Sequence, residues 1–184
     1  MSYNGMWFLI PAPAEAVERH GPRLRGALAA HAAEPGNREL RRRWEREGLG
    51  PEELECLAVG PLGEDLDALY AAWEDCGKAG PYAAVSARNR YPVLGVAHGL
   101  GPERMAALPG WFGDVVLTPE ELRASLPAVE AVFDLDGAAR AAAEERAVEV
   151  LRSDCPGDLF DVAVPVWRAA AAAGHGLIGA QLVP

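Results

Sequence analysis

Lysine is almost absent from this chain, and positive charge is scarce. The sequence has one lysine, Lys78, and its net charge at pH 7 is −10. Non-specific nucleic-acid binding and docking on anionic membranes both need clustered cations, so the composition argues against these classes. The net charge is compatible with a basic protein partner, but a solvated acidic surface is the favoured explanation. Glu39, Glu45 and Glu47 are interleaved with the arginines at 38–46, which favours a salt-bridged solvent face over a phosphate site.

Cysteine is also rare. Cys56, Cys76 and Cys155 are far apart and form no Cys-x-x-Cys pair, which argues against a disulfide framework or a zinc site. We interpret them as reduced thiols, mostly buried among apolar groups. No apolar run approaches the roughly 20 residues that span a membrane, and residues 5–10 are too short a run for a secretory signal. We therefore expect a cytoplasmic protein without a membrane segment.

Motifs for catalysis and metal binding are missing as well. Ser86, Ser125 and Ser153 lie in no Gly-x-Ser-x-Gly elbow, and the four histidines form no i, i+4 pair of the zinc type. The acidic residues at 134–136 and 158–161 stand at expected helix starts, where they serve as caps rather than as cation ligands. We expect neither a metal nor a cofactor, and the motifs alone do not identify a function.

The clearest positive signal is a helix start. Thr118 is followed by Pro119 and, three residues on, by Glu121. This spacing predicts a capping box with proline at the first helical position. Pro127 is expected to kink or divide this helix. Its predicted buried stripe consists of Leu122, Leu126, Val129 and Phe133.

Apolar periodicity predicts the remaining elements. Helices are expected over residues 14–20, 24–33, 38–47, 64–76, 104–108, 138–151 and 158–173, and strands over 6–10, 114–117 and 177–183. Residues 51–59 are expected to form a helical turn that runs into a short extended segment. Residues 82–85 and 92–96 are either short strands or irregular core segments. The 184 residues, half of them hydrophobic, fit a single domain spanning 1–184. Pairing the first and last strands gives an α+β fold, mostly helical, with a small mixed or antiparallel sheet.

Several local features refine these predictions. Gly21-Pro22 should interrupt the first helical region, and Asn37 should cap the helix that follows. Asp154 should cap the last helix, and Pro165 should bend it. The expected inward positions are Leu66, Leu69, Tyr70, Trp73, Val148, Leu151, Phe160, Val164 and Trp167.

His98 is the first candidate for chemistry. It lies in the glycine-rich segment 94–101, just before a possible helix start at Pro102-Glu103. Glycines allow a ligand to approach the backbone closely, and a helix N-terminus attracts anions. The spacing matches neither a P-loop nor a dinucleotide fingerprint, so a histidine hydrogen-bonded within a turn is favoured. His20 and His31 are expected on the surface.

His175 is a second candidate, just after the last expected helix. A donor there can interact with terminal carbonyls, which favours a C-cap over a binding site. Cys76 or Cys155 would be a nucleophile only if a histidine came near and the thiol pKa were lowered. Packing is the more frequent role of such thiols.

Five tryptophans are many for this length, and most should be buried. Trp111-Phe112 stands apart because glycines flank it on both sides. An exposed aromatic pair would mark an interaction site, whereas a buried pair would anchor a loop. The sequence leaves both alternatives open.

The order of features resembles the YfbM-like family of small bacterial proteins. The resemblance rests on Gly5–Ile10, Trp73-Glu74, Val93-Leu94-Gly95, Leu117–Leu122 and Ala172–Ile178. It implies a single α+β domain and no particular activity. Family members tend to have a histidine soon after a Trp-Asp pair, but Asp75-Cys76-Gly77 contains none, so that histidine's role cannot be transferred. The Ala, Gly, Pro and Arg bias is likewise typical of a high-GC bacterial genome.

We expect a non-catalytic binding or protein-interaction module. Its candidate ligand- or partner-binding residues are His98, Trp111, Phe112, Trp73 and His175. The alternative is a small hydrolase or transferase with His98 in its pocket. An enzyme would place His98 in a cleft within hydrogen-bond reach of a cysteine or carboxylate. The sequence predicts no specific partner and no oligomeric state.

Overall fold

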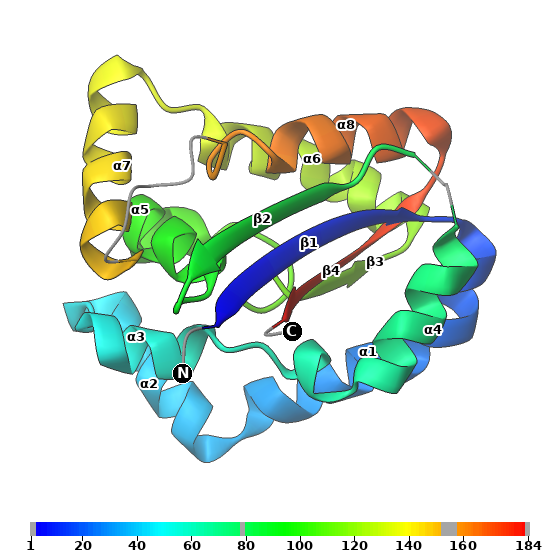
Figure 1. Cartoon of the computed structure of the whole chain (residues 1–184), viewed down its shortest axis with the longest axis horizontal. Coiled ribbons are helices and arrows are strands. Elements are labelled where there is room, and N and C mark those ends of the chain that lie inside the picture. The colour runs from blue at the N-terminus through cyan, green and yellow to red at the C-terminus, as the bar shows by residue number, and fades with distance from the viewer. Residues whose placement is uncertain (1–2, 78–79, 152–157, 183–184) are drawn as a thin grey trace.

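The computed structural model describes residues 3–77, 80–151 and 158–182. Within these ranges a four-stranded antiparallel sheet in the order β2-β1-β4-β3 is surrounded by helices, which confirms the predicted α+β fold (Figure 1). The strands are β1 (Asn4–Ala12), β2 (Ala83–Arg88), β3 (Val115–Leu117) and β4 (Gly176–Leu182). The helices are α1 (Ala14–Ala33), α2 (Pro35–Glu47), α3 (Pro51–Ala58), a 3₁₀ turn (Pro61–Glu64), α4 (Leu66–Cys76), α5 (Pro92–Ala106), α6 (Pro119–Phe133), α7 (Gly137–Leu151) and α8 (Ala163–Ala173).

The first and last strands pair, as the sequence predicts. β1 and β4 run antiparallel in the centre of the sheet, from Met6 opposite Leu182 to Ala12 opposite Gly176. Both strands are short apolar runs rather than strictly alternating ones, because helices cover both sides of the central strands. Among the described residues, no helix is both long and apolar enough to cross a bilayer.

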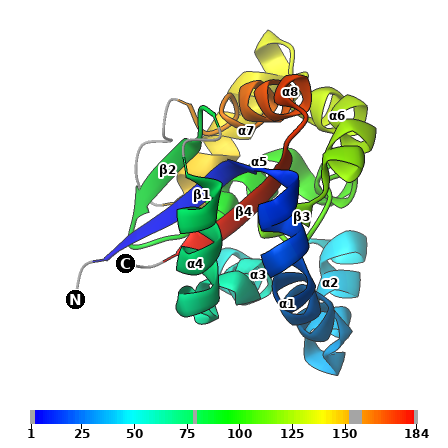
Figure 2. The ribbon, with the colours of Figure 1, turned by 90° about the vertical axis from the view of Figure 1, so that its right-hand side faces the viewer.

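Two hydrophobic cores share the sheet. On the first side, α1 and α4 pack on Val116, Ile178 and Ala180. On the opposite side, α3, α5, α6, α7 and α8 contribute to a larger core that includes Trp7 and Leu9 of β1. Figure 2 shows α1 and α4 in front of the strands. We call the first side the α4 face of the sheet.

The first helical region differs from the prediction. α1 runs without interruption through Gly21 and Pro22. Pro22 is exposed, so water can hydrate the carbonyl that its missing N–H leaves free, and the helix continues. Asn37 does not cap a helix start, because α2 already begins at Pro35. Its Nδ2 instead donates to the carbonyl oxygen of His31 at 2.9 Å, near the end of α1.

Other predictions fail for related reasons. Residues 92–96 belong to α5, which has a kink at Gly101 where φ is +77°. α6 continues undivided past the exposed Pro127. α8 begins only at Ala163, so Pro165 lies in the first turn, where an N–H has no helical partner to lose. Val148 is 41% exposed rather than inward-facing.

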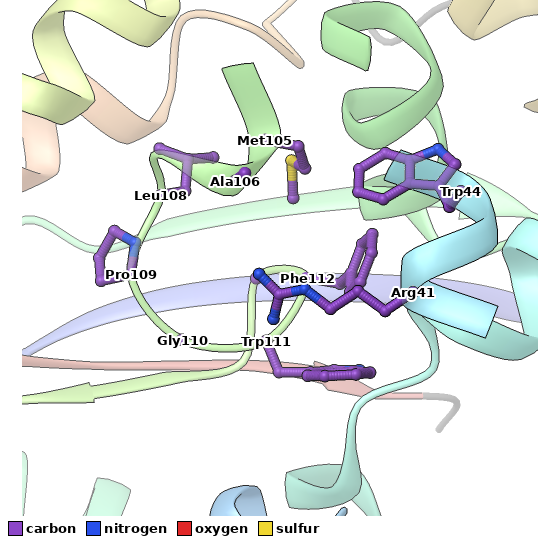
Figure 3. Close-up of a pocket in the computed structure, with 10 residues that line it drawn as sticks. Arg41, Trp44, Met105, Ala106, Leu108, Pro109, Gly110, Trp111 and Phe112 are labelled. Carbon is purple, nitrogen blue, oxygen red and sulfur yellow. The ribbon is translucent and has the colours of Figure 1, made fainter. Parts of the chain in front are cut away.

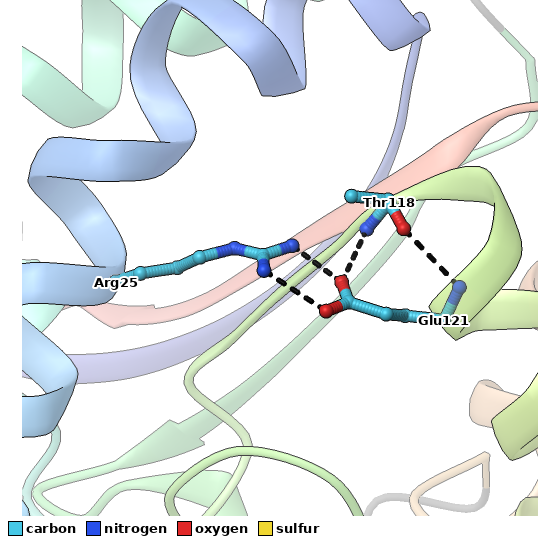
Figure 4. A network of polar contacts seen from close by, with 3 residues as sticks. All are labelled: Arg25, Thr118 and Glu121. Atoms are coloured by element: carbon cyan, nitrogen blue, oxygen red, sulfur yellow. Dashed lines mark hydrogen bonds and ion pairs between the residues drawn. The ribbon is translucent and has the colours of Figure 1, made fainter.

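The capping box at Thr118 is confirmed. The backbone N–H of Glu121 donates to Thr118 Oγ1 at 3.2 Å, and the backbone N–H of Thr118 donates to Glu121 Oε2 at 2.8 Å. Arg25 of α1 forms an ion pair with the same carboxylate, as Figure 4 shows. These contacts, the Arg25 hydrogen bonds first, lower the pKa of Glu121. The box therefore also ties α6 to α1. Lys78, Ser153, Asp154, Cys155 and Val183 lie outside the described residues.

Candidate interaction site

A row of aromatic side chains reaches the surface where α4 meets β1. Trp73 of α4 contacts Phe8 of β1, with ring centroids 5.1 Å apart, and also Tyr70 at 5.7 Å in an edge-on arrangement. Tyr70 is 54% exposed, and Tyr82, just before β2, is 66% exposed. We call these four residues the Trp73 surface. The rings of Phe8, Trp73 and Tyr70 contact one another, and Tyr70 and Tyr82 leave apolar area open to solvent.

Trp73 is the predicted binding residue that belongs to this surface. The ring is half-buried, and its indole Nε1 is buried without a hydrogen-bond partner among the described residues. Buried indole N–H groups normally find an acceptor.

The predicted inward stripe of α4 is wrong in part. The buried positions are Ala68, Leu69, Ala72 and Cys76, while Leu66 and Tyr70 are exposed. Small residues allow the helix backbone to approach the sheet and α1 closely. Asp67 and Glu74 lie at i−3 and i+4 from Tyr70, so the polar residues of the helix mark the exposed side. This amphipathic pattern was the available signal for Tyr70.

The α4 face of β2 is also open. Ala84, Ser86 and Arg88 are exposed, whereas the alternate residues Ala83, Val85 and Ala87 are buried on the other side. α4 packs mainly on β1 and α1, and β2 lies at the edge of the sheet (Figure 2). The open strip along β2 continues directly into the Trp73 surface, because Phe8 is paired with Ala84.

The charge around this surface is negative. Asp67 and Glu74 are exposed, and neither has an ion-pair partner among residues 3–77, 80–151 and 158–182. Asp75, by contrast, accepts hydrogen bonds from His20 and Arg19, which lower the pKa of its carboxyl group. Asp67 and Glu74 therefore flank Tyr70 with negative charge, and no cation among the described residues forms an ion pair with either of them.

Trp111 and Phe112, the other aromatic candidates, are buried. They are 3% and 7% exposed, so they anchor a loop and do not form an exposed interaction site. With Arg41 and Trp44 they line a cavity of about 20 Å³, which holds roughly one water molecule (Figure 3). The guanidinium of Arg41 stacks 5.5 Å from the Trp111 ring centre. A metabolite would not fit without rearrangement of these side chains.

Asp114 is a polar residue that sequence reasoning missed. Its carboxylate is fully buried and accepts the backbone N–H groups of Leu62 and Gln181, each at 2.9 Å. Burial raises the pKa of Asp114 to about 7, against the lowering effect of those two N–H groups. The Gln181 amide donates in turn to the carbonyls of Ala58 and Phe112. This network joins β4, the 3₁₀ turn and the Trp111 loop, which is a structural role.

The histidine candidates are not brought together. His98 lies on α5, where its Nε2 is 3.7 Å from a carboxylate oxygen of Glu149, and Glu149 is 70% exposed. None of the four cavities described for this molecule includes His98 in its lining. His175 caps α8 through its backbone, because its N–H donates to the carbonyl oxygen of Ala170 at 2.9 Å. Its Nδ1 is buried without a partner in the described ranges.

The thiols and carboxylates of the described residues show no arrangement for catalysis. Cys76 is buried, and desolvation followed by the charge of Asp75 raises the pKa of its thiol to about 11. Cys56 is exposed. Asp136 caps α7 through the N–H of Ala139. The part of the chain that the structure describes contains no group of three or more potential metal ligands.

Comparisons with known proteins give no relative for this chain. No family model matches it, and searches of curated proteins and of solved structures find no similar protein. The resemblance to YfbM-like proteins therefore stays a prediction, and any functional argument must come from the chain's own residues.

Proposed function

We propose that this chain is a protein-interaction module that binds a basic, partly apolar segment of a partner protein at the Trp73 surface. The row formed by Phe8, Trp73 and Tyr70 carries the proposal. Tyrosine and tryptophan at partly exposed positions are the residues that most often dominate binding energy, because they offer a large contact area at a small entropic cost. Their mutual ring contacts reduce that cost further.

The charge pattern supports a basic partner. Asp67 and Glu74 flank Tyr70, and the chain as a whole carries −10. An arginine or lysine of the partner would meet two carboxylates and the face of Tyr70, which favours cations. Such complementarity raises association rates and excludes acidic competitors. The expected cytoplasmic location is compatible with this role and belongs to the same proposal.

The hydrolase or transferase alternative rested on His98 in a pocket. The geometry of His98 and the raised pKa of Cys76 give that alternative no support among the described residues. The resemblance to YfbM-like proteins implies no activity, so it favours neither reading.

Selection of a random peptide phage library on the immobilised protein tests the proposal. We expect enriched peptides that combine arginine or lysine with apolar residues. In fluorescence polarisation, Tyr70→Ala combined with Tyr82→Ala should weaken their binding about tenfold or more, a loss of roughly 1.4 kcal/mol. Asp67→Asn with Glu74→Gln should weaken binding mainly at low salt, because exposed charges are screened at high salt.

The matched control changes an exposed acid and an exposed apolar residue elsewhere. Glu145→Gln with Val148→Ala lies on α7, and both positions are exposed. This variant should bind the selected peptides as the wild type does. Failure to enrich any peptide, or equal affinities for the wild type and the Tyr70/Tyr82 variant, would rule out the proposed site.

A further inference from the structure

The edge of β2 next to the Trp73 surface has unpaired backbone groups. β2 is the outermost strand, with only β1 beside it. The N–H of Asn89 donates to the carbonyl of Tyr3 across the β1–β2 pair at 2.8 Å, which fixes the phase of the ladder. In an antiparallel ladder, backbone groups alternate in direction. The backbone N–H and C=O groups of Ala87, Val85 and Ala83 therefore point toward β1. Those of Arg88, Ser86 and Ala84 point away from it.

The outward-pointing groups have no backbone partner among the described residues. Within the described residues, no backbone hydrogen bond joins Ala84, Ser86 or Arg88 to another segment beyond β1. The three side chains are exposed on the α4 face, and Ala84 and Ser86 are small. An additional strand could therefore lie along β2 and extend the α4 face of the sheet beyond Tyr82 and Phe8. Natural proteins usually protect an edge of this kind, because it is a template for pairing.

We propose that the partner segment binds as an extended strand added antiparallel or parallel to β2, with apolar residues at alternate positions on the α4 face. This inference rests on the proposed function and specifies how the same surface is used. The added strand's backbone would pair with Ala84, Ser86 and Arg88, which gives affinity. Its apolar side chains would lie over the open strip beside Phe8 and Tyr82, which gives specificity.

Charge identifies the occupant as a basic segment of another protein rather than a second copy. Two copies joined at β2 would bring together two chains of −10 each. A basic segment would instead be attracted by the net charge of the molecule and by the exposed Asp67 and Glu74 on α4. Arg88 at the far end of β2 favours an acidic or neutral residue at that end of the partner.

The first test uses a defined probe, a short peptide of alternating valine and lysine, on the uniformly ¹⁵N-labelled wild-type protein. We expect saturable binding that slows amide hydrogen exchange at Ala84, Ser86 and Arg88. A peptide of alternating valine and glutamate should not bind. A valine–lysine peptide N-methylated at every residue should bind at least tenfold more weakly, because it cannot donate to the edge in either strand direction. Protection at other amides and none at β2 would overturn the proposal.

The second test changes the edge itself. Ser86→Pro removes one outward N–H and leaves the bonds of Val85 and Ala87 to β1, and proline is tolerated at such edge positions. Its melting temperature reports whether it folds, and Ala84→Pro provides a second edge variant. We expect either proline to weaken peptide binding at least tenfold, whereas Ser86→Ala should bind normally. Unchanged binding by the folded proline variants would overturn the added strand.

The outcomes separate this inference from the proposed function. Peptides that lose affinity with Tyr70→Ala but not with Ser86→Pro would leave the Trp73 surface as the binding site and exclude strand addition. Peptides that respond to neither substitution would reject both proposals. A wild-type dimer in sedimentation equilibrium that Ser86→Pro converts to a monomer would show that a second copy occupies the edge, which overturns the choice of partner.

Discussion

At the scale of single residues, Asp114 has the clearest measurable consequence. Its pKa is raised from 3.8 to about 7 in the folded chain, because its carboxyl group is removed from water. Between about pH 4 and pH 7 the folded state therefore binds more protons than the unfolded state. Stability from this group is highest at low pH and falls as the pH rises through this window.

The first residue-scale prediction compares the wild type with Asp114→Asn, which cannot ionise. The wild-type free energy of unfolding, taken relative to the variant, should fall by up to about 4 kcal/mol between pH 4 and pH 7 and stay constant above pH 7. Urea unfolding at several pH values measures it. Both proteins contain Asp75, Glu121 and Asp161, whose lowered pKa values give stability that is lost as the pH falls. Because these contributions are the same in both proteins, they cancel in the difference. A pH-independent difference would contradict the raised pKa.

The sequence could not have revealed Asp114. Its carboxylate accepts from Leu62, 52 positions away, and from Gln181, 67 positions away. Contacts of that range arise from the tertiary fold and leave no local pattern. Tyr70 differs, because its polar neighbours Asp67 and Glu74 were visible in the sequence. The signal was concealed because the large apolar residues of this helix also fit the spacing of a buried stripe that includes Tyr70. In the structure, the small residues Ala68 and Ala72 are buried instead.

At the scale of elements, the start of α6 depends on a few local atoms. Thr118→Ala removes the acceptor for the N–H of Glu121 and should lower the free energy of unfolding by about 1 kcal/mol. Urea titration at neutral pH measures the change. Thr118→Ser keeps the hydroxyl group and should lose little. Equal stability of the alanine variant and the wild type would show that the cap contributes nothing.

Elements with local chemical signals were predictable, and elements decided by packing were not. The capping box, the αL glycine Gly174 after α8 and the two central strands follow from sequence patterns. Residues 92–96 form a helix although they contain β-branched residues and glycine. They are buried on nearly all sides, so they lack the amphipathic periodicity that would have predicted a helix. The predictions at Pro22 and Pro127 were wrong, because both prolines are exposed and water can hydrate the helix carbonyl that has lost its N–H donor.

At the scale of the whole molecule, the two cores share the same strands and should unfold together. Leu69 is fully buried in the smaller core between α4 and the sheet. Leu69→Ala should lower the free energy of unfolding by about 2–5 kcal/mol. We expect the same shift by tryptophan fluorescence, which reports mostly on the larger core, and by far-ultraviolet circular dichroism. A shift in circular dichroism alone would mean that the cores unfold separately.

The central position of β4 also affects how the chain matures on the ribosome. Translation reaches Gly176 only after every other strand has been made. Until then β1 has β2 on one side and an open edge on the other, and β3 has no strand partner at all. The nascent chain therefore has open strand edges until β4 is made. We expect these edges to make the incomplete chain more prone to aggregation than the finished fold.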